Sequence, residues 1–354
     1  MGQLRFLLAV AVIAFHSGLH VTGPLAVYSF FIMSGYAIFA GLGESMARNQ
    51  GVTRFFRRRL NKLLPNYLLT CLVVTVILVV AERWKAHSTK TLIANSDMYA
   101  SNNVWGIAKQ FVPTLTLSPW PMRANPNVPL VPPWWSVVLE LGFYLICALL
   151  VYTYRGERKI LLSYLAVTLV LHIYLLVVTG QDLGKLNKYV YFNFFGTLVF
   201  FALGNVCRYY SKGLKVKPNV GKGAFAALIL FIFFFSYAVK DPTQLVPGHP
   251  VWGYLFSVYF VSAATIIFLL NLPQGRIVSK NETFFANHSY GIYVWQSATF
   301  LLVNFAEHEH WWHSTAGLSR FVLVLILTML CSLGSSKVIH YSGATFRKLA
   351  STKS

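Results

Sequence analysis

Acidic residues, and charged residues in general, are scarce in this chain. Only 10 of its 354 residues are Asp or Glu, and all charged residues together make up 11% of the sequence. Soluble domains carry about 25% charged residues, which they need to cover a water-facing surface. The scarcity therefore excludes an ordinary soluble enzyme or a solvated binding module.

Cysteine pairs and the common catalytic motifs are missing as well. No CxxC spacing occurs, and the four cysteines all fall inside apolar runs, which excludes a disulfide framework and a thiolate zinc site. No GxGxxG, P-loop, GxSxG or HExxH sequence is present. His308, His310 and His313 stand together in a predicted outer loop at the interfacial aromatic belt, so we predict no metal there.

Long apolar runs are what the chain has instead. Hydrophobic residues make up 56% of the sequence and gather in runs of about 20 residues, the length that crosses a bilayer. We predict an all-α, polytopic transmembrane helix bundle that forms a single domain over residues 1–354, with a long extracytoplasmic loop at about 82–133. Ten spans are expected, at about 4–22, 25–43, 63–81, 134–154, 159–178, 189–208, 222–240, 251–271, 285–305 and 317–340.

The basic residues set the predicted orientation. Short clusters between the apolar runs place 20 Lys and Arg residues in one set of alternate loops and 8 in the other. Basic loops stay in the cytoplasm, so both termini are expected there. The net charge of +20 then indicates contact with anionic membrane lipid and not with nucleic acid, because no basic stretch is interleaved with aromatic residues in a polar context.

Three ionisable residues lie inside predicted spans, where each costs about 2.5–3.5 kcal/mol on insertion scales. Arg5 and His16 are 11 residues apart, so they share one face of the first helix about 16 Å apart. Glu140 lies six residues into the fourth span, and we expect it at the depth of His16, about 9 Å below the outer surface. A carboxylate beside a histidine favours a general base, while the alternative is that both residues only join helices by hydrogen bonds.

A basic cluster opens the third span, with Arg57, Arg58, Arg59 and Lys62 followed by Pro65. These charges could act only as topology signals. The alternative is that guanidinium groups and an ammonium group hold the phosphates of a soluble donor on the cytoplasmic side.

Five segments together resemble the acyltransferase-3 family, whose members are membrane O-acyltransferases that modify cell-surface polysaccharides, lipids and antibiotics. Arg5 and His16 are similar to its first-helix signature of an arginine and a histidine with ten residues between them. Residues 30–36 (FFIMSGY), 58–65 (RRLNKLLP), 135–144 (WSVVLELGFY) and 289–295 (SYGIYVW) resemble its later motifs in the same order. Two departures are Lys62, where the family has a second arginine, and Gln296, where many members have histidine.

The resemblance implies transfer of an acyl group, with acetyl as the expected one, from cytoplasmic acyl-CoA to a hydroxyl of a carbohydrate or lipid-linked acceptor. His16 would be the general base, with Glu140 orienting it. Arg5, Arg58, Arg59 and Lys62 would hold the phosphates of acyl-CoA, which is a co-substrate and not a permanently bound cofactor. The remaining motif residues are expected to contact substrates, namely Ser34, Tyr36, Trp135, Tyr144, Tyr290 and Gln296.

Two other functions fit the same residues. Ionisable groups inside spans also suit a proton-coupled transporter or flippase for a glycan or lipid intermediate, although no inverted repeat is visible. A non-catalytic membrane scaffold is the third hypothesis, and it would release no thiol from acyl-CoA. For the enzyme, the resemblance implies the inner membrane of a bacterium.

Overall fold

The computed structural model describes residues 1–19, 23–48, 51–84, 134–154, 158–215, 217–235, 250–272, 280–308 and 317–351. Helix accounts for 93% of these described residues, and none of them lies in a strand. The prediction of an all-α fold is therefore confirmed for this part of the chain. Most of the predicted loop at 82–133 and the histidines at 310 and 313 lie outside the described residues.

Four helices form the N-terminal part of the described chain: α1 (Gly2–His16), α2 (Gly23–Ala47), α3 (Gly51–Trp84) and α6 (Trp134–Tyr154). The remaining elements are α7 (Arg158–Thr179), α8 (Leu183–Leu186), the π-helical turn η1 (Asn187–Tyr191), α9 (Phe194–Ser211), α10 (Pro218–Leu230), the π-helical turn η2 (Phe231–Phe235), α12 (Pro250–Leu270), α13 (Lys280–His308) and α14 (Leu318–Ser351).

Each of the ten predicted spans overlaps a described helix. By length and composition, six helices among the described residues can cross a membrane: Gly23–Ala47, Gly51–Val80, Trp135–Thr153, Arg158–Thr179, Val251–Leu270 and Leu318–Ile339. The pair Leu183–Tyr191 and Phe194–Ser211, bent by 59°, would make a seventh, and Gly2–His16 and Pro218–Phe234 are shorter apolar helices. The count of ten and the orientation of the termini stay predictions.

The outward surfaces of α6 and α7 are apolar. Leu149, Val170 and Val177 are 64%, 65% and 74% exposed, although all three are aliphatic. In water such a surface would favour aggregation, whereas in a bilayer it meets acyl chains of the same polarity. The exposed side chains therefore agree with the apolar composition in indicating a membrane environment.

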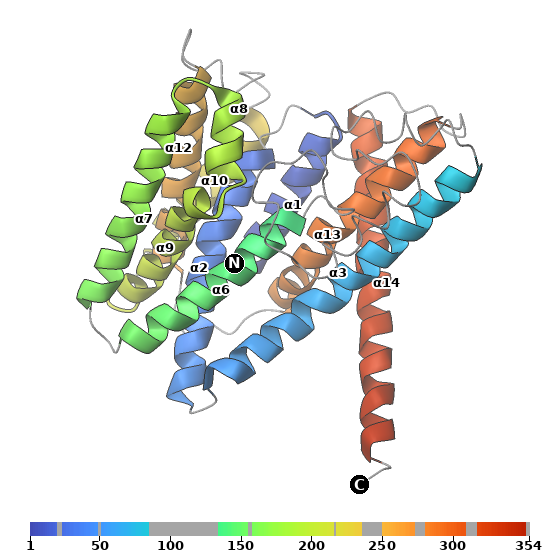
Figure 1. The fold of residues 1–354 in the computed structure, drawn as a ribbon, viewed down its shortest axis with the longest axis horizontal. Helices are drawn as coiled ribbons and strands as arrows, with labels where there is room; N and C mark the ends of the chain where they lie inside the picture. Colours follow the sequence, from blue (N-terminus) through green and yellow to red (C-terminus); the bar gives the residue numbers. More distant parts are fainter. Residues whose placement is uncertain are drawn as a thin grey trace.

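The helices form two groups joined through the centre (Figure 1). Figure 1 shows α7, α9, α10 and α12 on one side, α3, α13 and α14 on the other, and α1, α2 and α6 between them. The most extensive contacts are those of α2 with α9 and of α1 with α13, so α2 packs against one group and α1 against the other. Arg5, His16 and Ser34 thus lie on the helices in the middle of the molecule.

Two glycines allow α2 and α9 to cross in backbone contact. A Cβ atom added to Gly35 would lie 2.1 Å from the carbonyl oxygen of Phe201, and one added to Gly204 would lie 2.0 Å from that of Ile32. No side-chain adjustment relieves a clash with backbone, so only glycine fits at either position. Packing thus accounts for Gly35, and the adjacent Ser34 is left to face the centre of the bundle.

We expect Gly35→Ala and Gly204→Ala to destabilise the protein by about 1–3 kcal/mol or more, because the added methyl group must force the two helices apart. The measurement is the yield and melting temperature of detergent-purified protein. Gly43→Ala is the matched control, since an added Cβ there meets no atom within 4 Å. Equal behaviour of all three variants would contradict the close crossing.

Candidate active site

A cavity of about 80 Å³ lies between α1, α2, α3, α6 and α13. Apolar side chains form part of its wall, and the rest is polar or charged. The polar lining consists of Arg5, Ser34, Arg59, Lys62, Ser136, Glu140, Tyr144, Ser289, Tyr290 and Tyr293. We call this space the central cavity. Seven of these ten residues are among those that the sequence predicted for the site, apart from Ser136, Ser289 and Tyr293.

Glu140 is held in the cavity wall by two hydroxyl groups. Its Oε1 accepts hydrogen bonds from Ser34 Oγ at 3.2 Å and from Tyr144 Oη at 2.7 Å. Tyr144 lies one turn further along α6, and Ser34 stands next to Gly35 at the close α2–α9 crossing. The carboxylate is therefore fixed in position, and within the described chain its Oε2 has no hydrogen-bond donor.

Arg5 faces the same cavity from the first turns of α1. One terminal nitrogen donates to the carbonyl oxygen of Met33 at 3.2 Å, while its Nε is buried and meets no hydrogen-bond partner among the described residues. The charges of Glu140 and Arg59 both act on Arg5, and those of Arg5 and Glu140 act on Lys62. Three cations thus surround one carboxylate, so the cavity carries an excess of positive charge that suits an anionic ligand.

Two tyrosines from α13 complete the cavity. The hydroxyl of Tyr293 is hydrogen bonded to Ser136 Oγ at 2.8 Å, which joins α13 to α6. The hydroxyl of Tyr290 is buried and has no partner in the described part of the chain. It is a free donor at the cavity wall.

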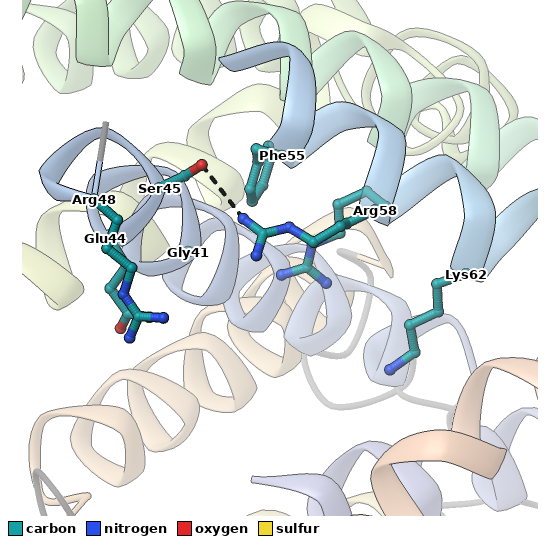
Figure 2. Close-up of a pocket in the computed structure, with 8 residues that line it drawn as sticks. Gly41, Glu44, Ser45, Arg48, Phe55, Arg58 and Lys62 are labelled. Atoms are coloured by element: carbon teal, nitrogen blue, oxygen red, sulfur yellow. Dashed lines mark hydrogen bonds between the residues drawn. The ribbon is translucent and has the colours of Figure 1, made fainter. Parts of the chain in front are cut away.

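A second, larger space of about 260 Å³ opens where α2 ends and α3 begins (Figure 2). We call it the basic pocket, and its lining is Gly41, Glu44, Ser45, Arg48, Phe55, Arg58, Arg59 and Lys62. Arg58 donates to Ser45 Oγ at 3.3 Å, and the guanidinium group of Arg59 lies 5.5 Å from the ring centroid of Phe55. Four cations and one carboxylate surround this space.

Arg59 and Lys62 are shared by the two spaces, since each lines both the basic pocket and the central cavity. They lie three residues apart, close to one turn of α3, and so share a face of that helix. The four residues predicted to hold phosphates are thus arranged in order, with Arg58 on the pocket side, Arg59 and Lys62 shared, and Arg5 on the cavity side. An elongated anionic ligand fits this order.

His16 lies away from the central cavity, and the predicted pairing with Glu140 is wrong in this structure. His16 is an exposed residue at the end of α1, and its ring centroid lies 5.2 and 5.9 Å from those of Phe15 and Phe300. No hydrogen bond or ion pair within the described chain joins it to Glu140. Glu140 is instead at the level of Arg5, so about 16 Å of α1 separates the two residues that we expected at one depth.

The physical reason is the placement of α6. Our estimate of depth counted residues from Trp134 as if the helix began at the membrane surface and ran straight across. In the structure α6 lies obliquely across the bundle (Figure 1), and its seventh residue, Glu140, shares the central cavity with Arg5 near the start of α1. Arg5 and His16 do lie on one continuous helix, as expected, and 11 residues correspond to about three turns.

Phe300 also borders a polar group that the sequence analysis did not identify. The guanidinium group of Arg320, on α14, lies 5.9 Å from the Phe300 ring centroid. Arg320 also donates to Asn304 and lies 3.9 Å from Glu307. Beyond Phe300, which contacts His16, α13 thus carries an amide and a carboxylate, Asn304 and Glu307, that both interact with Arg320.

Three predicted substrate contacts lie outside both spaces. Tyr36 is hydrogen bonded to Ser211 on α9 at 3.3 Å, and Trp135 packs 4.9 Å from the rings of Tyr191 and Phe192. Gln296 is buried, and its amide nitrogen donates to the carbonyl oxygen of Tyr293. These residues contribute to helix packing in this structure, and their roles as substrate contacts stay predictions.

Sequence reasoning missed Ser45, Arg48 and Glu44, which share the basic pocket with the predicted arginines. No motif contains them, and Arg48 appeared only as a topology signal. Ser136, Ser289 and Tyr293, by contrast, stand inside the motif segments at 135–144 and 289–295, and that position was a usable signal.

The comparisons with known proteins give one match. A family model described as an acyltransferase domain matches residues 1–337. No curated protein and no solved structure matches the chain. The match covers nearly all of the sequence and includes every residue of the central cavity and the basic pocket. The chain belongs to the acyltransferase-3 family and is a membrane acyltransferase.

Proposed function

We propose that this protein moves an acyl group from acyl-CoA to a hydroxyl of a carbohydrate or lipid-linked acceptor. The observation that carries the proposal is the shared wall of Arg59 and Lys62, which joins a basic pocket to a cavity that also contains Arg5. Acyl-CoA is an elongated molecule with phosphates at one end and a thioester at the other. The basic pocket would face the cytoplasm, where this donor is found.

The donor's phosphates would bind Arg59 and Lys62, with Arg5 beyond them. Arginine is suited to phosphate because its planar guanidinium group binds two oxygens at once, and Lys62 adds a compact charge. Glu140 offsets part of the cavity's positive charge, and its hydrogen bonds to Ser34 and Tyr144 keep it in place. We assign it to the organisation of the cations, and no longer to the orientation of His16.

The pantetheine arm would then run along the face of α1 that Arg5 and His16 share, a distance of about 16 Å. At its end His16 takes the proton of the acceptor hydroxyl as that oxygen attacks the thioester carbonyl. The carbon–sulfur bond breaks, and the coenzyme A thiolate accepts this proton from the imidazolium of His16. An ester and free coenzyme A are the products. The exposed position of His16 suits an acceptor that arrives from the other side of the membrane.

The test is transfer of label from acetyl-CoA carrying a radioactive acetyl group. Purified protein is incubated with this donor and with membranes from cells that lack the gene, and the free thiol of coenzyme A is measured in parallel. We expect thiol release together with label in a glycan or lipid fraction, removable by mild alkali as an ester. Movement of a glycan or lipid across the membrane without thiol release would indicate a flippase and overturn the proposal.

A further inference from the structure

We propose that Arg48 and Arg58, at the outer end of the basic pocket, form a binding site for the 3′-phosphate of the donor's nucleotide. This proposal rests on acyl-CoA being the donor, as proposed above. Neither residue lines the central cavity, whereas Arg59 and Lys62 line both spaces. The basic pocket therefore has an inner pair of cations and an outer pair. The nucleotide of coenzyme A has two separate phosphate groups, a 5′-diphosphate next to the pantetheine arm and a 3′-phosphate further out.

Arg58 is held in a defined position by Ser45. Ser45 is 2% exposed, and its Oγ donates to the carbonyl oxygen of Gly51 at 3.0 Å while it accepts from Arg58 at 3.3 Å. A guanidinium group has five N–H donors, and only this one is used among the described residues. Figure 2 shows Arg58 extended toward Ser45 within the pocket. The remaining donors are preorganised for phosphate oxygens.

Arg48 supplies the second positive charge, from the end of α2 on the opposite side of the pocket from α3. It follows directly after α2, one helical turn beyond Glu44, and it lines the pocket opposite the side chains of α3 (Figure 2). No carboxylate of the described chain lies within 4 Å of its guanidinium group, so the charge of Arg48 is not neutralised by an ion pair. Two guanidinium groups, one from α3 and one from the residue after α2, thus line the same pocket.

Glu44 distinguishes this pocket from a site for inorganic phosphate alone. A carboxylate weakens the binding of an isolated anion, but it accepts hydrogen bonds from a ribose hydroxyl or from the amino group of adenine. A phospholipid headgroup shares the phosphate chemistry and is the other source of such a ligand. The size of about 260 Å³ and the second cation pair favour the bisphosphorylated nucleotide.

The experiment measures binding of two probes to the purified full chain in neutral detergent. Adenosine 3′,5′-bisphosphate has both phosphate positions, and adenosine 5′-monophosphate lacks the 3′-phosphate. We expect the wild type to prefer the bisphosphate by at least about tenfold, since a hydrogen bond to a charged group contributes that much. Arg48→Gln and Arg58→Gln should remove most of this preference and leave binding of the monophosphate unchanged.

Arg57→Gln is the matched control, because Arg57 is exposed on the same helix, lies next to Arg58 and does not line the pocket. It removes the same charge and should keep the preference. Equal loss in all three variants, or no preference in the wild type, would overturn the nucleotide site. If phosphatidylglycerol added to the micelles displaces the bisphosphate, and Arg48→Gln weakens the binding of this lipid but not that of the bisphosphate, the ligand is a headgroup and the proposal is wrong.

Thiol release from acetyl-CoA on the same preparations separates the two proposals. The probes carry no acyl group, so their binding does not depend on catalysis. Bisphosphate preference without any thiol release would count against acyl transfer, whereas thiol release without the preference would count against the 3′-phosphate site alone.

Discussion

Replacing His16 with alanine should abolish acyl transfer while donor binding stays intact. A positioned general base contributes about 10²–10⁴-fold, and we expect the turnover number to fall by at least about 100-fold. His16 lines neither the central cavity nor the basic pocket, so binding of adenosine 3′,5′-bisphosphate should be unchanged. The measurement combines the rate of thiol release from acetyl-CoA in the presence of acceptor membranes with the nucleotide binding assay.

His288→Ala is the control for this loss. His288 is a partly buried histidine of α13 whose ring nitrogen is hydrogen bonded to Ser332 on α14, and it does not line the central cavity. It should keep normal turnover. Near-normal turnover of His16→Ala would exclude it as the general base, and a loss of nucleotide binding would indicate a general structural defect instead.

Replacing Glu140 with glutamine should destabilise the free protein and increase its dependence on ligand. The amide keeps the size of the side chain but leaves Arg5, Arg59 and Lys62 without a neighbouring negative charge. We expect a loss of about 1–3 kcal/mol, less than the 3–5 kcal/mol of a broken contact ion pair, because no cation of the described chain lies within 4 Å of Glu140. Coenzyme A then supplies negative charge and should raise the melting temperature more than in the wild type.

Tyr144→Phe serves as the comparison, because it removes one hydrogen bond to Glu140 Oε1 and keeps the charge. Its expected cost is only about 1 kcal/mol. If Glu140→Gln left the melting temperature unchanged and lowered turnover to the level of His16→Ala, the carboxylate would act with His16, and the assignment to the cation cluster would be wrong.

The helices were predictable from the sequence because runs of about 20 apolar residues allow little else. Each predicted span overlaps a described helix, and the third extends back through the basic cluster to Gly51. Boundaries and tilts were not predictable, because they depend on contacts between helices. The depth of Glu140 shows this, since the count from Trp134 could not include the oblique path of α6.

The candidate site was predictable where one helix carries the pattern. Arg5 with His16, and Arg58 with Arg59 and Lys62, lie at spacings that a single helix fixes. The basic pocket, however, forms between the end of α2 and the start of α3, and Arg48 enters it only because the chain reverses there. Tyr36 shows the same limit, because its hydrogen bond to Ser211 on α9 depends on the close crossing of α2 and α9 and not on a spacing within α2, and its role as a substrate contact stays a prediction.

Arg59 and Lys62 line both the basic pocket and the central cavity, so they couple the two spaces electrostatically. An anion that neutralises these side chains from the pocket side also changes the electric field at Glu140, and the coupling free energy is the same in both directions. An anion bound in the basic pocket therefore shifts the apparent affinity of the central cavity for a second charged group, and the reverse also holds. A kinetic effect of substituting either residue therefore cannot be attributed to one space alone. Arg48 lines only the basic pocket and Arg5 only the central cavity, so substitutions of these two arginines separate the contributions of the two spaces.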